Sequence, residues 1–187
     1  MDNSILEAVK VLKEGGLILY PTDTIWGIGC DATNEKAVAK VYALKQREDS
    51  KALVMLAADL DMVARYVQEI PQMAIQLVEV NDAPMTIIYP GATGLAPNAI
   101  AEDGSVGIRI PLAGSCIDLV KRFGRLLVST SANISGEPSP KNFDEIPQRI
   151  KDGVDYIVNP ELALESSGKA SQIIKVGLDS EIKIIRA

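Results

Sequence analysis

Short apolar runs recur along the chain at a length that suits buried β-strands. The runs at 17–20, 85–89 and 106–110 are bounded by Gly, Pro or Ser. Runs of this length with turn residues at their ends predict strands rather than helices. Further strands are predicted at 53–57, 126–128, 154–158, 172–176 and 182–185.

Between these runs, apolar positions follow the spacing of amphipathic helices. Asn34 can cap a helix in which Ala37, Val38 and Val41 share one face. Ser4 and Glu7 form a capping-box pattern, which predicts that a first helix begins at Ser4 and ends near Gly15–Gly16.

Three further helices are predicted in the middle of the chain. Apolar residues from Met62 to Ile70 suit one helical face, Pro71 can start a helix that runs to about residue 80, and a third is predicted at 117–123. Strands and helices interleave without a repeat, a low-complexity segment or a linker. We therefore predict one α/β domain over residues 1–187.

The composition excludes a membrane protein and argues against a nucleic-acid-binding protein. The 187 residues are 47% hydrophobic and contain no apolar run near the roughly 20 residues of a membrane helix. Residues 1–14 carry both charge signs and do not resemble a signal peptide. We therefore expect a cytoplasmic protein. The net charge of −6 argues against a general nucleic-acid binder, although a local basic patch stays possible.

The chain contains no histidine, which excludes Ser–His and Cys–His nucleophiles and a histidine general base. Cys30 and Cys116 are far apart in sequence and are expected to be buried free thiols. Catalysis must therefore use Lys, Arg, carboxylates, hydroxyls, backbone amides or a bound metal. No protein metal site is predicted.

A basic cluster, Lys45-Gln-Arg47-Glu-Asp-Ser-Lys51, lies at the end of the helix that Asn34 caps. Cations are common at helix C-termini because they oppose the negative end of the dipole, and spacing alone favours this interpretation. The alternative is a triphosphate clamp, in which Arg offers a planar fork and Lys a point charge.

Hydroxyl side chains crowd the segment that follows the strand at 126–128. Ser129, Ser131, Asn133 and Ser139 lie within eleven positions. Such groups can bind phosphate, ribose or an ammonium group, or they can form a turn that bonds its own backbone.

Two further features carry polar chemistry next to apolar strands. The segment Pro21-Thr-Asp-Thr24-Ile-Trp26 places hydroxyls after a strand, where Thr24 could orient a small polar ligand and Trp26 is expected in the core. Arg109 lies inside an apolar strand and needs an internal carboxylate or an anionic ligand.

In this order the motifs resemble those of the YrdC family, the threonylcarbamoyl-adenylate synthases. They are Pro-Thr-Asp-Thr-Ile-Trp-Gly-Ile-Gly at 21–29, Lys-Gln-Arg at 45–47, Val-Gly-Ile-Arg-Ile-Pro at 106–111 and Ser-Ala-Asn-Ile-Ser-Gly at 131–136. The resemblance spans residues 16–186. It implies a single-domain twisted mixed sheet with flanking helices and a concave cleft.

The resemblance also implies a reaction and its site. Members of the family condense L-threonine, bicarbonate and ATP to threonylcarbamoyl-adenylate and pyrophosphate, a product that other proteins use to modify tRNA. Lys45, Arg47, Ser131 and Asn133 match the family's catalytic quartet. The implied nucleotide site consists of Lys45, Arg47, Lys51, Ser105, Ser131, Asn133, Ser139 and Arg186. The implied threonine site consists of Thr24, Arg109, Ser129 and Ser171. Mg²⁺ is expected on the phosphates, held mainly by substrate oxygens and water.

Some positions depart from the family pattern. Leu56 stands where many members have His, and Gln172 follows Ser171 where Thr is usual. These departures leave open a YciO-like paralogue of weak or different activity. A double-stranded RNA-binding module, or weak binding of tRNA, is a third interpretation, although the acidic composition opposes it.

Overall fold

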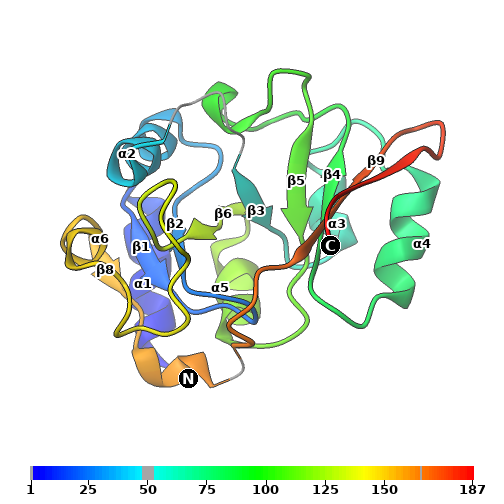
Figure 1. Cartoon of the computed structure of the whole chain (residues 1–187). Helices are drawn as coiled ribbons and strands as arrows, with labels where there is room; N and C mark the ends of the chain where they lie inside the picture. Colours follow the sequence, from blue (N-terminus) through cyan, green and yellow to red (C-terminus); the bar gives the residue numbers. More distant parts are fainter. Residues whose placement is uncertain (1, 48–52, 165) are drawn as a thin grey trace.

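A computed structural model describes residues 2–47, 53–164 and 166–187, which form a mixed α/β fold (Figure 1). The α-helices are α1 (Asn3–Lys13), α2 (Glu35–Lys45), α3 (Leu60–Ala64), α4 (Gln72–Val80), α5 (Ser115–Phe123) and α6 (Gln148–Asp152). Short 3₁₀ helices occur at Pro97–Ala99 and Pro160–Ala163.

Within these residues the strands divide between two sheets. The four-stranded sheet has the order β7-β2-β1-β8, formed by β1 (Ile18–Tyr20), β2 (Gly27–Gly29), β7 (Thr130–Ser131) and β8 (Tyr156–Ile157). The six-stranded sheet has the order β10-β9-β4-β5-β3-β6, formed by β3 (Val54–Leu56), β4 (Met85–Tyr89), β5 (Val106–Arg109), β6 (Leu127–Val128), β9 (Gln172–Val176) and β10 (Ile182–Arg186). Both sheets mix parallel and antiparallel pairs, so the predicted mixed α/β class with flanking helices is confirmed.

One segment passes directly from one sheet to the other. β6 is an edge strand of the six-stranded sheet, β7 is an edge strand of the four-stranded sheet, and only Ser129 separates them. The Ser129 amide donates to the Val54 carbonyl at 2.8 Å, and the Val128 amide donates to the Cys30 carbonyl at 2.9 Å. The backbone is thereby fastened to both sheets, and Ser129 and Ser131 lie between them.

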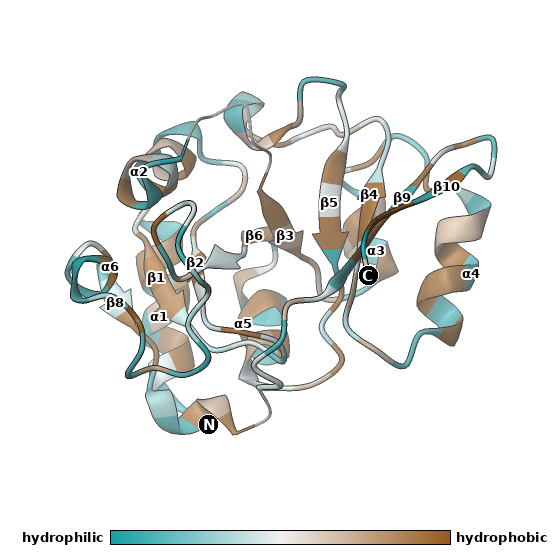
Figure 2. Ribbon diagram, in the orientation of Figure 1, coloured by the Kyte–Doolittle hydropathy of each residue, from teal (hydrophilic) through white to brown (hydrophobic). Residues whose placement is uncertain are grey.

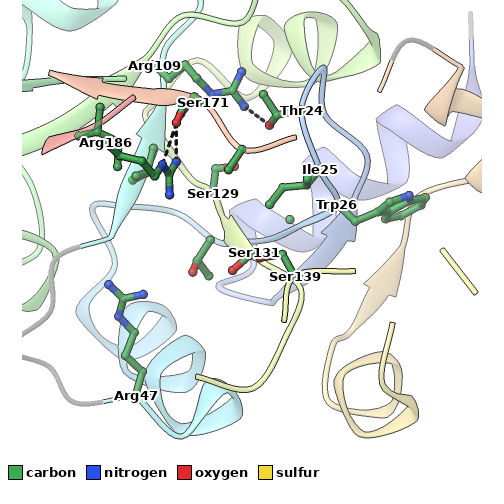
Figure 3. Close-up of a pocket in the computed structure, with 15 residues that line it drawn as sticks. Thr24, Ile25, Trp26, Arg47, Arg109, Ser129, Ser131, Ser139, Ser171 and Arg186 are labelled. Carbon is green, nitrogen blue, oxygen red and sulfur yellow. Dashed lines mark hydrogen bonds between the residues drawn. The ribbon is translucent and has the colours of Figure 1, made fainter. Parts of the chain in front are cut away.

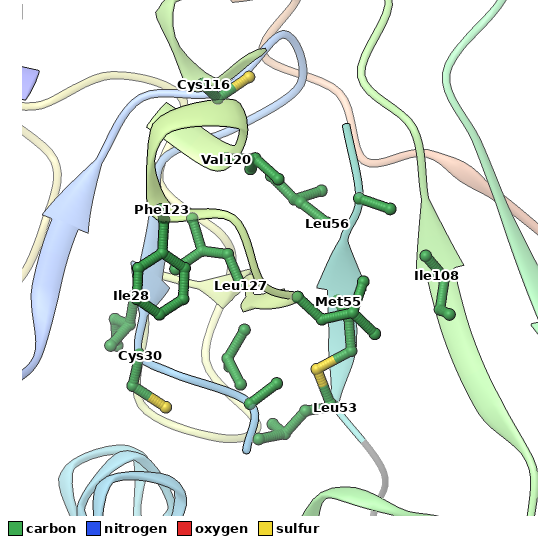
Figure 4. Packing of buried hydrophobic residues seen from close by; sticks show 14 of the residues in the cluster. Ile28, Cys30, Leu53, Met55, Leu56, Ile108, Cys116, Val120, Phe123 and Leu127 are labelled. Carbon is green, nitrogen blue, oxygen red and sulfur yellow. The ribbon is translucent and has the colours of Figure 1, made fainter. Parts of the chain in front are cut away.

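The core fills the space between the sheets and the helices. Hydrophobic residues concentrate on β1, β3 and β5 (Figure 2), and a close view shows Ile28, Met55, Leu56, Phe123 and Leu127 packed together from four elements (Figure 4). Each is buried, and burial of a large apolar side chain stabilises a fold by about 1.5–3 kcal/mol.

Both cysteines are buried free thiols, as predicted. Burial raises the pKa of Cys30, and it raises the pKa of Cys116 to about 11. Neither thiol is therefore poised as a nucleophile at neutral pH.

None of the helices in the described part of the chain is long and apolar enough to span a lipid bilayer.

Two local predictions are wrong, and both fail because of contacts that are distant in sequence. The N-cap of helix α1 is Asp2, two residues before the Ser4 cap that the capping box implies, and the Asp2 side chain accepts from the Ser4 amide at 2.8 Å. The Ser4 hydroxyl instead accepts from the Asn159 amide at 2.8 Å. Helix α3 ends before Arg65, whereas the prediction continued it to Ile70, because Val67 forms a β-bridge with Ala92.

Candidate functional site

A polar cavity of about 230 Å³ opens between the two sheets (Figure 3). Its walls come from the loop before β2, the end of α2, the end of β5, the β6–β7 crossing and the start of β9. The lining residues are Thr24, Ile25, Trp26, Gly27, Arg47, Val54, Arg109, Ser129, Thr130, Ser131, Ser139, Ala170, Ser171, Ile173 and Arg186.

Three arginines from three different elements meet at this cavity. Arg47 follows α2, Arg109 ends β5 and Arg186 ends β10. Burial lowers the pKa of both Arg47 and Arg186, yet a guanidinium stays charged at neutral pH. Among the described residues that line the cavity, none is a carboxylate. The arrangement therefore suits a ligand that carries several negative charges.

Arg109 has an internal partner as well as a face on the cavity. Its Nη1 donates to a carboxylate oxygen of Asp23, and its Nη2 donates to the Thr24 hydroxyl at 3.2 Å. Arg109 and Asp23 are only 3% and 5% exposed, and the Leu112 amide donates to the second Asp23 oxygen at 3.2 Å. A guanidinium has five N–H donors, so these contacts orient Arg109 without using all of them.

An internal carboxylate and an anionic ligand, the two explanations offered for a buried arginine, are therefore both compatible with this geometry. Asp23 provides the internal carboxylate, and the remaining donors can meet an anionic group in the cavity. Asp23 lies within the motif at 21–29 but is not among the site residues that the sequence predicts. An acidic residue in the same segment as Thr24 was the available signal, because a buried arginine needs a partner.

Lys45 holds the hydroxyl-rich segment together rather than reaching into the cavity. It is 1% exposed, and its ammonium donates to the Ser131 carbonyl at 2.6 Å, the Asn133 carbonyl at 2.8 Å and the Asn133 Oδ1 at 2.9 Å. An ammonium group has three donors, so these acceptors use all of them. The Lys45 ammonium therefore joins the end of α2 to the segment that contains Ser131 and Asn133.

Titration of Lys45 gives the first testable prediction. Burial, and after it the neighbouring Arg47, lower the pKa of Lys45 to about 8, whereas an exposed lysine has a pKa of about 10.4. Between these values the unfolded chain binds more protons at this residue than the native chain does. The residue's contribution to the free energy of unfolding should therefore increase with pH above about 8, by at most about 1.4 kcal/mol per pH unit.

Urea unfolding of the wild type and of Lys45→Met between about pH 7 and pH 10 measures this contribution as the difference between the two proteins. The difference should be constant up to about pH 8 and then grow in favour of the wild type. A difference that stays flat across the whole range contradicts the lowered pKa.

The β6–β7 crossing and its loop supply the remaining hydroxyls. Ser131 donates to Asn133 Oδ1 at 2.5 Å, and Asn133 Nδ2 donates to the Glu137 carbonyl at 2.6 Å. The Ser135 amide donates to the Lys45 carbonyl at 2.8 Å, which fastens the loop to α2 a second time. Asn133 thus shapes the loop, whereas Ser131 and Ser139 line the cavity.

The six-stranded sheet contributes a linked pair on the opposite wall. The Ser171 hydroxyl is 2.8 Å from the Thr86 hydroxyl, and both residues are buried. Arg186 donates to the Ser171 carbonyl from Nε at 2.9 Å and from Nη2 at 2.6 Å. Figure 3 shows Ser171 beside Arg109, with Arg186 joined to Ser171 by two hydrogen bonds.

The structure brings most of the sequence-predicted residues to one place. Eight line the cavity: Thr24, Arg47, Arg109, Ser129, Ser131, Ser139, Ser171 and Arg186. Lys45 and Asn133 lie directly behind the wall. Ser105 lies at the other end of β5 from Arg109, and its hydroxyl donates to Asp103 Oδ1 at 2.5 Å, so the structure does not bring it to the cavity. Lys51 lies outside the described residues.

Leu56 and Trp26 are two further residues of this region, and neither is predicted to be catalytic. Leu56 is fully buried in the apolar core and does not line the cavity. Trp26 is buried as expected and stacks at a tilt on Phe143 with ring centroids 5.0 Å apart, which supports one wall. Within the described ranges, no group of three or more Cys, Asp or Glu side chains could hold a metal ion.

Comparisons with known proteins agree on one family. A family model described as "Telomere recombination", for the Sua5, YciO and YrdC proteins, matches residues 10–187. The threonylcarbamoyl-AMP synthase of Stenotrophomonas maltophilia is 35% identical over 157 residues, which cover 82% of this chain and 84% of that protein. The synthase of Idiomarina loihiensis is 31% identical over 173 residues, which cover 91% of this chain and 90% of that protein.

Solved structures share the fold. Sua5 of P. abyssi, complexed with L-threonine, matches with a TM-score of 0.80 at 24% identity over 92% of this chain and 50% of Sua5. The present chain thus spans about half the length of that protein. YciO of E. coli matches with a TM-score of 0.79 at 22% identity over 97% of this chain and 87% of YciO. On the family match and the two synthase relatives, the chain belongs to the Sua5/YciO/YrdC family.

Proposed function

We propose that this chain is a threonylcarbamoyl-AMP synthase, a nucleotidyltransferase that condenses L-threonine, bicarbonate and ATP. The observation that carries the proposal is the meeting of Arg47, Arg109 and Arg186 at one hydroxyl-lined cavity that has no carboxylate among its described lining residues. Relatives that bear this name match over more than four fifths of the chain.

On the nucleotide side, Arg47 and Arg186 offer charge-assisted hydrogen bonds to the triphosphate. Ser139 lies at the exposed rim and can donate to a phosphate oxygen. Ser131 gives its proton to Asn133, so it faces the cavity as an acceptor, which suits a ribose hydroxyl. Lys51 is the remaining candidate for the phosphates, and Lys45 and Asn133 hold the loop that presents Ser131.

On the amino-acid side, Arg109 binds the threonine carboxylate. Asp23 holds its guanidinium in place, because both groups are buried and hydrogen-bonded. Thr24, Ser129 and Ser171 line the same cavity and can bind the amine or the hydroxyl of threonine.

The chemistry requires little of the protein beyond position and charge. The threonine amine adds to bicarbonate with loss of water, which gives a carbamate. A carbamate oxygen attacks the α-phosphorus, the bond to the β-phosphate breaks, and pyrophosphate leaves in line with the attack. Arginines that neutralise the phosphates, and side chains that hold the two substrates in contact, lower this barrier without a histidine base.

Mg²⁺ is proposed as a companion of ATP. The described residues offer no carboxylate cluster for it, so its ligands would be phosphate oxygens and water. In the cytoplasm the product would pass to enzymes that modify tRNA. Direct RNA binding is expected to be weak because the chain carries a net charge of −6.

Pyrophosphate release tests the proposal. Purified protein with ATP, L-threonine, bicarbonate and Mg²⁺ should release pyrophosphate only when all three substrates are present. A YciO-like paralogue of different activity would release none, and an RNA-binding module would bind duplex RNA tightly in the same preparation without releasing pyrophosphate. Either result, in an assay where an active synthase works, overturns the proposal.

A further inference from the structure

Thr22 lies behind the cavity wall with all its hydrogen-bonding capacity in use. It is 4% exposed and does not line the cavity. Its hydroxyl donates to the Ile25 carbonyl at 2.7 Å, accepts from the Thr24 amide at 3.1 Å and lies 2.9 Å from the Thr24 hydroxyl. A carbonyl cannot donate, so the single proton of Thr22 is committed to Ile25.

Because the Thr22 proton is donated to Ile25, the direction of the hydrogen bond between the Thr22 and Thr24 hydroxyls is fixed. Because Thr22 has no second proton, the Thr24 hydroxyl must donate to Thr22. The Thr24 oxygen also accepts from Arg109 Nη2 at 3.2 Å. A hydroxyl has one donor and two acceptor sites, so Thr24 has one acceptor site left and no donor. Thr24 lines the cavity, and that acceptor site is what it can offer a ligand.

We propose that Thr22 is a positioning residue that sets the polarity of the amino-acid site through Thr24. With Thr22 in place, Thr24 accepts from the ligand and cannot donate to it. A substrate must then present an N–H or O–H group to Thr24 beside a carboxylate bound to Arg109. The inference rests on the proposed function and adds a specificity determinant to it.

The polarity also fixes which way the amino acid lies. A carboxylate placed against Thr24 would meet a second acceptor with no proton between them, which is unfavourable in a buried site. The same carboxylate finds unused donors on Arg109, next to Thr24. The donating amine or hydroxyl of the substrate is thus directed to Thr24, and the carboxylate to Arg109.

The backbone around Thr24 is held by contacts that do not involve Thr22. The Thr24 carbonyl accepts from the Ser166 hydroxyl at 2.7 Å and from the Gly168 amide at 2.7 Å, and the Asp23 carbonyl accepts from the Ser167 amide at 3.0 Å. Removal of the Thr22 hydroxyl should therefore change the direction of the Thr24 proton more than the position of its backbone.

Thr22→Val keeps the shape of the side chain and removes the hydroxyl. We expect KM and Kd for L-threonine to rise about tenfold, because the Thr24 proton is no longer held by Thr22 and can turn toward the substrate's donor, while KM for ATP stays within about twofold. Thr22→Ser restores the hydroxyl and should return KM for L-threonine to within about twofold of the wild type. Circular dichroism melting of each variant reports whether the fold is retained.

A double-mutant cycle tests whether Thr22 acts through Thr24. Thr24→Val removes the acceptor itself, so Thr22→Val in that background should cause no further loss of threonine affinity. Additive losses, an equal loss of ATP affinity, or unchanged threonine affinity in Thr22→Val would each overturn the inference. A wild-type protein that binds no L-threonine would instead overturn the proposed function, so the two failures are distinguishable.

Discussion

Arg109→Met is expected to abolish L-threonine binding and to lower the free energy of unfolding by about 3–5 kcal/mol, because it leaves the buried Asp23 carboxylate without its charge partner. Isothermal titration with L-threonine and urea unfolding measure the two effects. The stability loss alone would not identify a substrate site, so a second variant is needed.

Asp23→Leu combined with Arg109→Met separates the structural role from the binding role. An apolar pair of similar volume removes both buried charges, which is often neutral for stability. We expect the double variant to regain most of the lost stability and none of the threonine binding. Threonine binding that returns with stability would show that Arg109 supports the fold and does not bind the substrate.

Arg47→Ala is expected to reduce kcat/KM for ATP by about 100-fold, the typical effect of removing one preorganised donor to developing charge. The side chain follows the end of α2 and lines the cavity, so its loss should leave Kd for L-threonine nearly unchanged. Steady-state kinetics with each substrate varied in turn give this result directly.

Arg122→Ala is a matched control, because Arg122 is an exposed arginine on α5 that does not line this cavity. It should have wild-type kinetics. Full activity in Arg47→Ala, or an equal loss in both variants, would contradict the assignment of Arg47 to the triphosphate.

Elements bounded by strong local signals are the ones that the sequence predicts well. Pro84 and Pro90 enclose β4, and its predicted and observed bounds coincide. Asn34 caps α2 by accepting from the Ala37 amide at 3.1 Å, as its residue type suggests. The errors arise where a distant residue competes with the local pattern. The Ser4 hydroxyl accepts from the Asn159 amide instead of capping α1, and Val67 forms a β-bridge with Ala92.

The division into two sheets follows from pairings that local sequence does not record. β7 has only two residues and lies within the hydroxyl-rich segment, where its pairing with Gly27 decides its conformation. A glycine favours this close approach, since a Cβ at Gly27 would lie 3.3 Å from the Ser129 hydroxyl. Without that pairing, the hydroxyl-rich sequence around β7 predicts a turn.

The sequence predicts which residues form the site better than it predicts what each of them does. The family resemblance identifies eight residues that line the cavity, but a cation looks the same in sequence whether it meets a phosphate or an internal carbonyl. Lys45 binds the carbonyls of Ser131 and Asn133, and Arg109 binds Asp23. The Ser105 hydroxyl donates to Asp103, two residues away, at the far end of β5 from Arg109.

The most direct test of the account is identification of the product. The protein is incubated with ATP, L-threonine, Mg²⁺ and either ordinary or ¹³C-labelled bicarbonate, and the nucleotides are analysed by mass spectrometry. We expect a threonylcarbamoyl-AMP peak that becomes one mass unit heavier with the label and is absent when threonine is omitted. Conversion of ATP without such a peak, or no conversion at all, would contradict it.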